Sequence, residues 1–206
     1  MLKSSAWIRS ENSAGNLELL KTIREFSFFI KHMIKDPRST GALIPSSAGL
    51  GHAMSSCLPL GVGQVVELGG GTGRITNEIL KIGVPASNLT VFEMNPEFTA
   101  LLKTRFPGLR VENRMAQAMP ELGITEVGAV VSGLPLLNMS VEIQDDIVAS
   151  VLTALRPGGC FIQFTYGFKP PLAPEVIQKH GLTWQKRKSV WINLPPAHVY
   201  VFQRQS

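Results

Sequence analysis

The chain has 206 residues, of which 44% are hydrophobic and 17% are charged. This composition excludes a largely disordered chain, which would be rich in charge and poor in apolar residues. No apolar run reaches the roughly 18 residues of a membrane span, and residues 1–15 lack the apolar stretch of a secretory signal. The two cysteines, Cys57 and Cys160, have no metal-ligand spacing, so we expect cytosolic thiols and no metal site.

The net charge of +5 is concentrated at the two ends of the chain. Residues 1–38 carry seven Lys and Arg against four Asp and Glu, and residues 169–206 carry six against one. Residues 39–168 carry seven against ten. Basic ends of this kind either bind an anionic partner, such as nucleic acid or a membrane surface, or are simply solvated termini.

Residues 1–15 are polar and small, whereas residues 16–35 have the periodicity of an amphipathic helix. Such a helix either lies in a membrane headgroup region or packs its apolar arc on the domain. A second, short helix is expected after residues 46–47, where either serine can cap it. The charged face of the first helix contains Lys21, Arg24, Lys31 and Lys35, with Phe28 among them.

From residue 62 onward, strand-like apolar runs alternate with helical stretches. This alternation predicts βαβ units on a parallel sheet, and two final strands joined by a Pro-Pro loop predict an antiparallel pair at its edge. Helices are expected at 74–82, 96–106 and 141–155. Strands are expected at 65–68, 89–92, 109–111, 129–132, 160–165, 182–192 and 198–203.

A glycine loop at 69–73 follows the first of these strands and leads into a helix. Glycines let a ligand approach the backbone closely, and the helix N-terminus offers free N–H groups. The dinucleotide fingerprint G-x-G-x-x-G fails, because its sixth position is Arg74 or Thr76. Glu67 suits a cationic ligand group, and Glu93 ends the next strand, where a carboxylate can accept two ribose hydroxyls. The alternative is a tight turn with two solvated acids.

The strand, the glycine loop and the two acids resemble motifs I and II of the class I S-adenosylmethionine-dependent methyltransferases. Residues 155–159 resemble the turn before strand five of that family. The resemblance implies a Rossmann-like α/β fold whose seven-stranded sheet ends in two antiparallel strands. It also implies S-adenosylmethionine as cofactor, S-adenosylhomocysteine as product, and no metal. The cofactor-binding residues that it implies are Glu67, Gly69, Gly71, Gly73, Glu93, Met94, Met115, Ala116 and Ser132.

Segments outside the cofactor motif resemble bacterial phospholipid N-methyltransferases, over about residues 26–202. These segments are 29–37, 40–47, 131–137, 163–167 and 193–200. The resemblance implies methylation of the headgroup amine of phosphatidylethanolamine towards phosphatidylcholine. It implies a cytoplasmic enzyme, peripheral on the inner face of the cell membrane, whose basic first helix meets an anionic surface. The expected division is a loose terminus at 1–15, membrane or lid helices at 16–60, and a methyltransferase domain at 61–206.

Methyl transfer from a sulfonium to an amine requires the amine to be neutral, so a proton must leave. Tyr166, His198 and Tyr200 are candidates to orient the amine or to accept that proton, and Asn193 is a candidate to bind substrate. Each has a structural alternative: Tyr200 in the core, and His198 or Asn193 in the turn.

Two other functions stay open. An rRNA adenine dimethylase has similar motifs, but residues 132–136 lack the amide and the stacking aromatic of its acceptor loop. Base extrusion also needs a basic groove, and the middle of this chain is net acidic, so nucleic acid is not the expected partner. The non-enzyme alternative is a relative that binds lipid or cofactor without turnover. No feature of the sequence indicates the oligomeric state.

Overall fold

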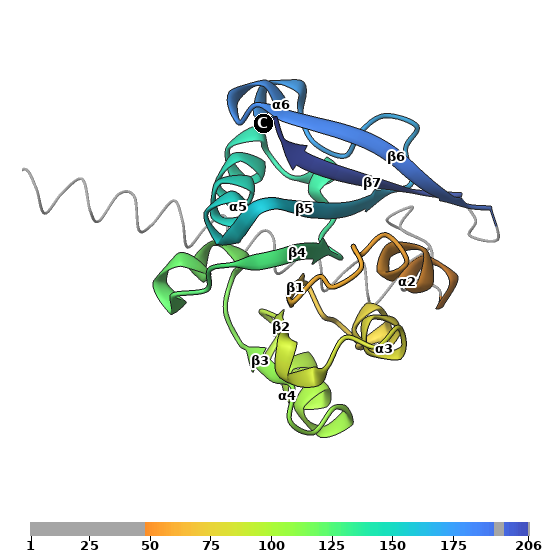
Figure 1. The fold of residues 1–206 in the computed structure, drawn as a ribbon, viewed down its shortest axis with the longest axis vertical. Coiled ribbons are helices and arrows are strands. Elements are labelled where there is room, and N and C mark those ends of the chain that lie inside the picture. Colours follow the sequence, from red (N-terminus) through yellow and green to blue (C-terminus); the bar gives the residue numbers. More distant parts are fainter. Residues whose placement is uncertain (1–47, 192–195, 206) are drawn as a thin grey trace, which may run out of the picture. The chain divides into compact units, whose positions relative to one another are not determined.

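A computed structural model describes residues 48–191 and 196–205 (Figure 1). The helix predicted at 16–35, with Lys21, Arg24, Phe28, Lys31 and Lys35, lies outside the described residues, as does Asn193. No helix in the described ranges is long and apolar enough to cross a membrane.

A seven-stranded sheet forms the centre of the fold, in the order β3-β2-β1-β4-β5-β7-β6. The first five strands are parallel, and β7 is antiparallel to both of its neighbours, β5 and β6. This arrangement confirms the predicted fold class and its antiparallel C-terminal pair. The strands are β1 (Gln64–Leu68), β2 (Leu89–Phe92), β3 (Arg110–Glu112), β4 (Val127–Ser132), β5 (Leu155–Thr165), β6 (Leu182–Val190) and β7 (Ala197–Arg204).

Helices cover both faces of this sheet (Figure 1). Asn95 caps α4 by accepting hydrogen bonds from two backbone N–H groups, and Pro96 occupies the first turn, as its sequence predicts. The short helix α6 was not predicted. The helices are α2 (Ala48–Ser55), α3 (Arg74–Lys81), α4 (Pro96–Arg105), α5 (Val141–Ala154) and α6 (Pro174–Lys179), with 3₁₀ turns at Ala86–Asn88, Ala116–Ala118, Pro120–Leu122 and Leu136–Asn138.

Two apolar cores lie on opposite faces of the sheet. Leu50 and Met54 of α2 and Ile79 of α3 are buried in one of them, and Ile147 and Val151 of α5 are buried in the other. Each such side chain stabilises the fold by about 1.5–3 kcal/mol. Both faces being covered explains why β2 and β4 are buried along their whole length.

The start of β5 differs from the prediction. Residues 155–159 were expected to form a turn before the strand, but they belong to β5 itself. The pairing is irregular there: β5 advances from Leu155 to Cys160 while β4 advances only from Val127 to Ala129. Gly158, with φ of +74°, sits in this irregular part. The turn-like sequence therefore produces a bulge within the strand.

The thiols of Cys57 and Cys160 are both free, as expected. Burial raises the pKa of the Cys160 thiol to about 11. Cys160 is therefore an inert core residue.

The order of the strands indicates where a ligand binds: at the carboxyl ends of the parallel strands, which are called the carboxyl edge of the sheet here. The chain order reverses between β1 and β4, which are neighbours in the sheet. Ligands of open α/β sheets bind at such a point, beyond the carboxyl ends of the strands. The site is built from this edge.

Candidate active site

The glycine loop at 69–73 joins the carboxyl end of β1 to α3. Gly71 has φ of +51°, a left-handed conformation, and no heavy atom of the described residues lies within 4 Å of where its Cβ would be. At Gly73 a Cβ would come within 2.5 Å of the Phe106 ring. The loop thus packs closely behind Gly73 and presents an open backbone at Gly71.

Glu93 connects this loop to the second strand. Its Oε2 accepts a hydrogen bond of 2.8 Å from the backbone N–H of Gly71, and its Oε1 accepts one of 2.7 Å from Asn95. The residue is buried. Each carboxylate oxygen has a further lone pair. Glu93 can therefore hold the loop and still accept hydroxyl groups of a ligand.

Glu67 is fully buried on β1, directly before the loop. Its Oε2 accepts a 2.6 Å hydrogen bond from the Thr76 hydroxyl of α3, whereas its Oε1 has no partner among the described residues. Burial raises the pKa of Glu67 to about 8, against the lowering effect of the Thr76 hydrogen bond. An unpaired buried carboxylate is costly, so Glu67 holds a proton at pH 7 in the unliganded protein. A cationic group of a ligand beside Oε1 would favour the ionised form and take the place of that proton.

Replacing Glu67 by Gln is expected to change how the stability of the unliganded protein depends on pH. Because its folded pKa of about 8 lies above the ordinary value of 4.5, the folded state binds more protons than the unfolded state between these values. Wild-type stability should therefore fall as pH rises from about 4.5 to 8, and Glu67→Gln should be more stable than wild type at pH 8.5 by about 2–4 kcal/mol. Denaturant unfolding of both proteins at pH 5 and 8.5 measures this. The same difference in unfolding free energy between the two proteins at both pH values would contradict it.

His198 lies at the same edge of the sheet, near the start of β7. It pairs in register with Thr165, the last residue of β5, and it is 1% exposed. Its Nδ1 is 2.9 Å from the Ser189 hydroxyl, and its Nε2 has no partner within the described residues. Burial, helped by the nearby charge of Lys186, lowers the pKa of His198. The imidazole is therefore neutral at pH 7.

The tyrosines differ in role. Tyr200 is buried in the core and its hydroxyl donates to the Phe168 carbonyl at 3.0 Å, which favours its core alternative over a catalytic role. Tyr166 follows the carboxyl end of β5, half-buried with its ring edge-on to Phe164. Burial raises the pKa of the Tyr166 phenol, which stays protonated at neutral pH. Tyr166 stays a candidate to orient an amine.

Gln163 is not among the site residues predicted from the sequence. It is fully buried on β5, and its Nε2 donates a 2.7 Å hydrogen bond to the carbonyl of Leu134, in the loop after β4. Its Oε1 has no partner within the described ranges. A single amide between Ile162 and Phe164 in an apolar strand was the available signal.

The remaining predicted cofactor residues lie after the carboxyl ends of β2, β3 and β4. The Met94 carbonyl accepts from Asn113, and the Ala116 carbonyl accepts from Ser150. Ser132 ends β4, and its hydroxyl accepts from Leu134 N–H at 3.2 Å. Met115 precedes a 3₁₀ turn and is half-buried. Their contacts with a cofactor stay predictions.

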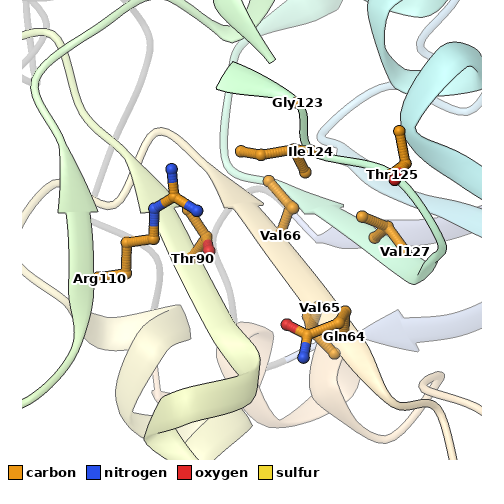
Figure 2. Close-up of a pocket in the computed structure, with 9 residues that line it drawn as sticks. All are labelled: Gln64, Val65, Val66, Thr90, Arg110, Gly123, Ile124, Thr125 and Val127. Atoms are coloured by element: carbon orange, nitrogen blue, oxygen red, sulfur yellow. The ribbon is translucent and has the colours of Figure 1, made fainter. Parts of the chain in front are cut away.

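A cavity of about 160 Å³ opens at the other end of the sheet (Figure 2). Gln64, Arg110 and Val127, the first residues of β1, β3 and β4, contribute to its lining. It therefore lies away from the glycine loop, at the end of the strands where ligands of this fold are not bound. Among the described residues, no three His, Cys, Asp or Glu side chains are grouped as a metal site.

Comparison with known proteins places the chain in a family. No profile of a known family matches it. It is 33% identical, over 151 residues, to the ornithine lipid N-methyltransferase of Singulisphaera acidiphila, covering 69% of this chain and 79% of that protein. The chain belongs to this lipid N-methyltransferase family. This protein is thus an enzyme that depends on S-adenosylmethionine, as the sequence predicts.

Solved structures show the same fold for this lipid N-methyltransferase. The 1,6-didemethyltoxoflavin-N1-methyltransferase of Burkholderia thailandensis, solved with S-adenosylhomocysteine, matches with a TM-score of 0.64 at 16% identity, covering 91% of this chain and 90% of that one. A TehB-like methyltransferase of Corynebacterium glutamicum matches with a TM-score of 0.61 at 16% identity, covering 85% and 97%. Both are class I methyltransferase folds, as predicted here.

The residues at this edge fit S-adenosylmethionine. The cofactor supplies an electrophilic methyl group on a sulfonium when it is bound. The open backbone at Gly71 lets a ligand approach closely. Oε1 of Glu67, which has no partner among the described residues, suits a positive charge on that ligand, and the Glu93 carboxylate suits a ribose.

Proposed function

We propose that this enzyme methylates the headgroup amine of a membrane lipid, and that phosphatidylethanolamine is a substrate. One observation carries the proposal: the neutral imidazole of His198 lies at the same sheet edge as the glycine loop and its two acids. The relatedness to an ornithine lipid N-methyltransferase supports a lipid acceptor. The residue pattern of segments 29–47, 131–137 and 193–200 supports phosphatidylethanolamine.

His198 accepts the proton that the amine must lose. If Nδ1–H donates to the Ser189 hydroxyl, the lone pair of Nε2, which is buried and has no partner among the described residues, is the one that would act as a base. The order β1-β4-β5-β7 places β7 three strands from the glycine loop, roughly 14 Å at about 4.8 Å per strand. An amine bound over β4 and β5 would therefore lie between the cofactor loop and His198. Tyr166, which follows β5, is positioned to orient it.

Glu67 and Glu93 divide the binding of the cofactor between them. Glu93 accepts the ribose hydroxyls while it holds Gly71, and Glu67 balances the positive charge of the amino-acid part of the cofactor through Oε1. Glu67 lies on β1 and Glu93 directly follows β2, and both are buried, so they are pre-positioned before the cofactor arrives.

Transfer of label from S-adenosylmethionine tests the proposal. Each set of vesicles would contain an anionic lipid and one test lipid, which is phosphatidylethanolamine, ornithine lipid or, as the control without a free amine, phosphatidylcholine. Ribosomal RNA would be tested in a parallel reaction. We expect label in phosphatidylethanolamine and none in phosphatidylcholine or RNA. Label in RNA alone would establish an adenine methyltransferase instead. Binding of S-adenosylmethionine without transfer to any acceptor would establish a non-catalytic relative.

The protein is proposed to dock on the inner face of the cell membrane through the basic residues of segment 16–35. Replacing them by Gln should abolish methylation of vesicle lipid and leave S-adenosylmethionine affinity unchanged, because each basic residue near an anionic surface contributes about 1 kcal/mol. Salt should release the wild type from the vesicles. Vesicle co-sedimentation and label transfer measure both effects. The replaced residues are Lys21, Arg24, Lys31 and Lys35.

A control with the same loss of charge separates docking from net charge. It changes four exposed basic residues of the described fold to Gln, and it should bind and methylate vesicles as the wild type does. Equal activity of the two variants would remove segment 16–35 from the docking account. The control residues are Lys103, Arg114, Arg156 and Arg204.

A further inference from the structure

Two exposed aromatic side chains flank His198. Phe168, which follows β5, is 80% exposed, and Trp191, which follows β6, is 72% exposed. The Phe168 ring lies 5.4 Å from the His198 ring, tilted by 42°, and the Trp191 ring lies 6.2 Å from it, nearly perpendicular at 85°. The segment after β5 and the segment after β6 therefore each bring one aromatic ring against the same imidazole.

The backbone under this cluster is held in place. The Phe168 carbonyl accepts the Tyr200 hydroxyl, and the neighbouring Gly167 N–H donates to the Thr165 hydroxyl at 2.9 Å. Ser189 fixes the His198 ring. The Phe168 ring is thus presented to solvent from an anchored backbone beside a fixed imidazole, and a contiguous exposed apolar patch is a usual mark of a binding site.

The charge of the cluster defines what can cover it. None of the ring or hydrogen-bond contacts of these three side chains within the described residues involves a carboxylate, and the charge that acts on His198 is the positive one of Lys186. Segment 192–197, which joins Trp191 to His198, contains no acid either. A strongly hydrated primary ammonium gains little at a site without a carboxylate. A methylated ammonium sheds water more readily and binds well against aromatic faces.

We propose that Phe168 and Trp191 form an aromatic clamp that binds the methylated ammonium of a partly methylated lipid headgroup beside His198. The proposal rests on the proposed function. It assigns to these two residues a preference for the partly methylated headgroups, which are the substrates of the second and third methyl transfers. In each transfer the nitrogen lone pair forms the N–C bond while the S–C bond breaks and its electron pair remains on sulfur. The proton of the secondary or tertiary ammonium passes to Nε2 before the attack.

Steady-state kinetics with two acceptors tests the clamp. Vesicles would contain either phosphatidylethanolamine or its N,N-dimethyl derivative. For Trp191→Ala we expect KM for the dimethyl lipid to rise roughly tenfold, with KM for the unmethylated lipid changed less than twofold and kcat retained. Trp191→Phe should restore most of the preference. Trp184→Ala is the matched control, because that exposed Trp lies against Tyr200 and not against His198.

Equal increases in KM for both acceptors, or no change for either, would overturn the clamp. A second measurement separates this failure from failure of the proposed function. Soluble phosphocholine should change the tryptophan fluorescence of the wild type and leave that of Trp191→Phe unchanged, and phosphoethanolamine should need a roughly tenfold higher concentration for the same change. If the wild type methylates neither lipid, the proposed function fails, and this titration still decides the clamp.

Discussion

Replacing His198 by Asn is expected to lower kcat by about 10²–10⁴-fold, the usual contribution of a general base. The Asn amide occupies the position of Nδ1 and keeps the hydrogen bond to Ser189, whereas nothing replaces Nε2. Affinity for S-adenosylmethionine should stay within twofold. Single-turnover label transfer into phosphatidylethanolamine vesicles measures the chemical step, and calorimetry measures binding.

The pH profile distinguishes a base from a structural histidine. Burial lowers the pKa of His198 below the ordinary 6.5, so the base is unprotonated at pH 7 and becomes protonated only in acid. The wild-type kcat/KM should therefore fall below pH 6.5, and His198→Asn should lack that acid limb. His52→Asn, at an exposed histidine on α2, is the matched control and should keep it. An acid limb that persists in His198→Asn would assign the limb to another group.

Removing the Glu93 carboxylate should weaken S-adenosylmethionine binding by roughly 10- to 150-fold. Hydrogen bonds to a charged group contribute about 1.5–3 kcal/mol, and Glu93→Ala removes the acceptor for the ribose. The same change frees the Gly71 and Asn95 N–H groups that hold the loop. Isothermal calorimetry measures the loss, with exposed Glu97→Ala on α4 as the control. Unchanged affinity would remove Glu93 from the cofactor site, and NAD should bind neither protein.

The cofactor half of the site could be predicted because its signals are local. Glycines at 69–73 have few alternatives in a strand-to-helix turn, and acids that end parallel strands must share one edge. The structure accordingly brings Glu93 against Gly71. Local signals also predict two element boundaries. A short run of mostly apolar residues gives the bounds of β2, and an Asn-Pro cap gives the start of α4.

The acceptor half could be predicted only as a set of candidates, Tyr166, His198, Tyr200 and Asn193, because their placement depends on pairing between distant segments. Alternation alone did not tell whether Tyr200 faces the core, and a histidine beside a Pro-Pro loop looks like a turn residue. Only the register of β7 against β5 and β6 places His198 beside Thr165 and Ser189. The contact of Phe168 and Trp191 with the same ring arises from that register and leaves no trace in either segment's sequence.

A crystal structure with S-adenosylhomocysteine and a soluble headgroup amine tests the central claim, that cofactor and amine meet at the carboxyl edge of the sheet. The account predicts the ribose hydroxyls within hydrogen-bond distance of Glu93 and the amine between the sulfur atom and Nε2 of His198. Density for the cofactor in the cavity lined by Arg110 and Val127, at the opposite end of the strands, would contradict it.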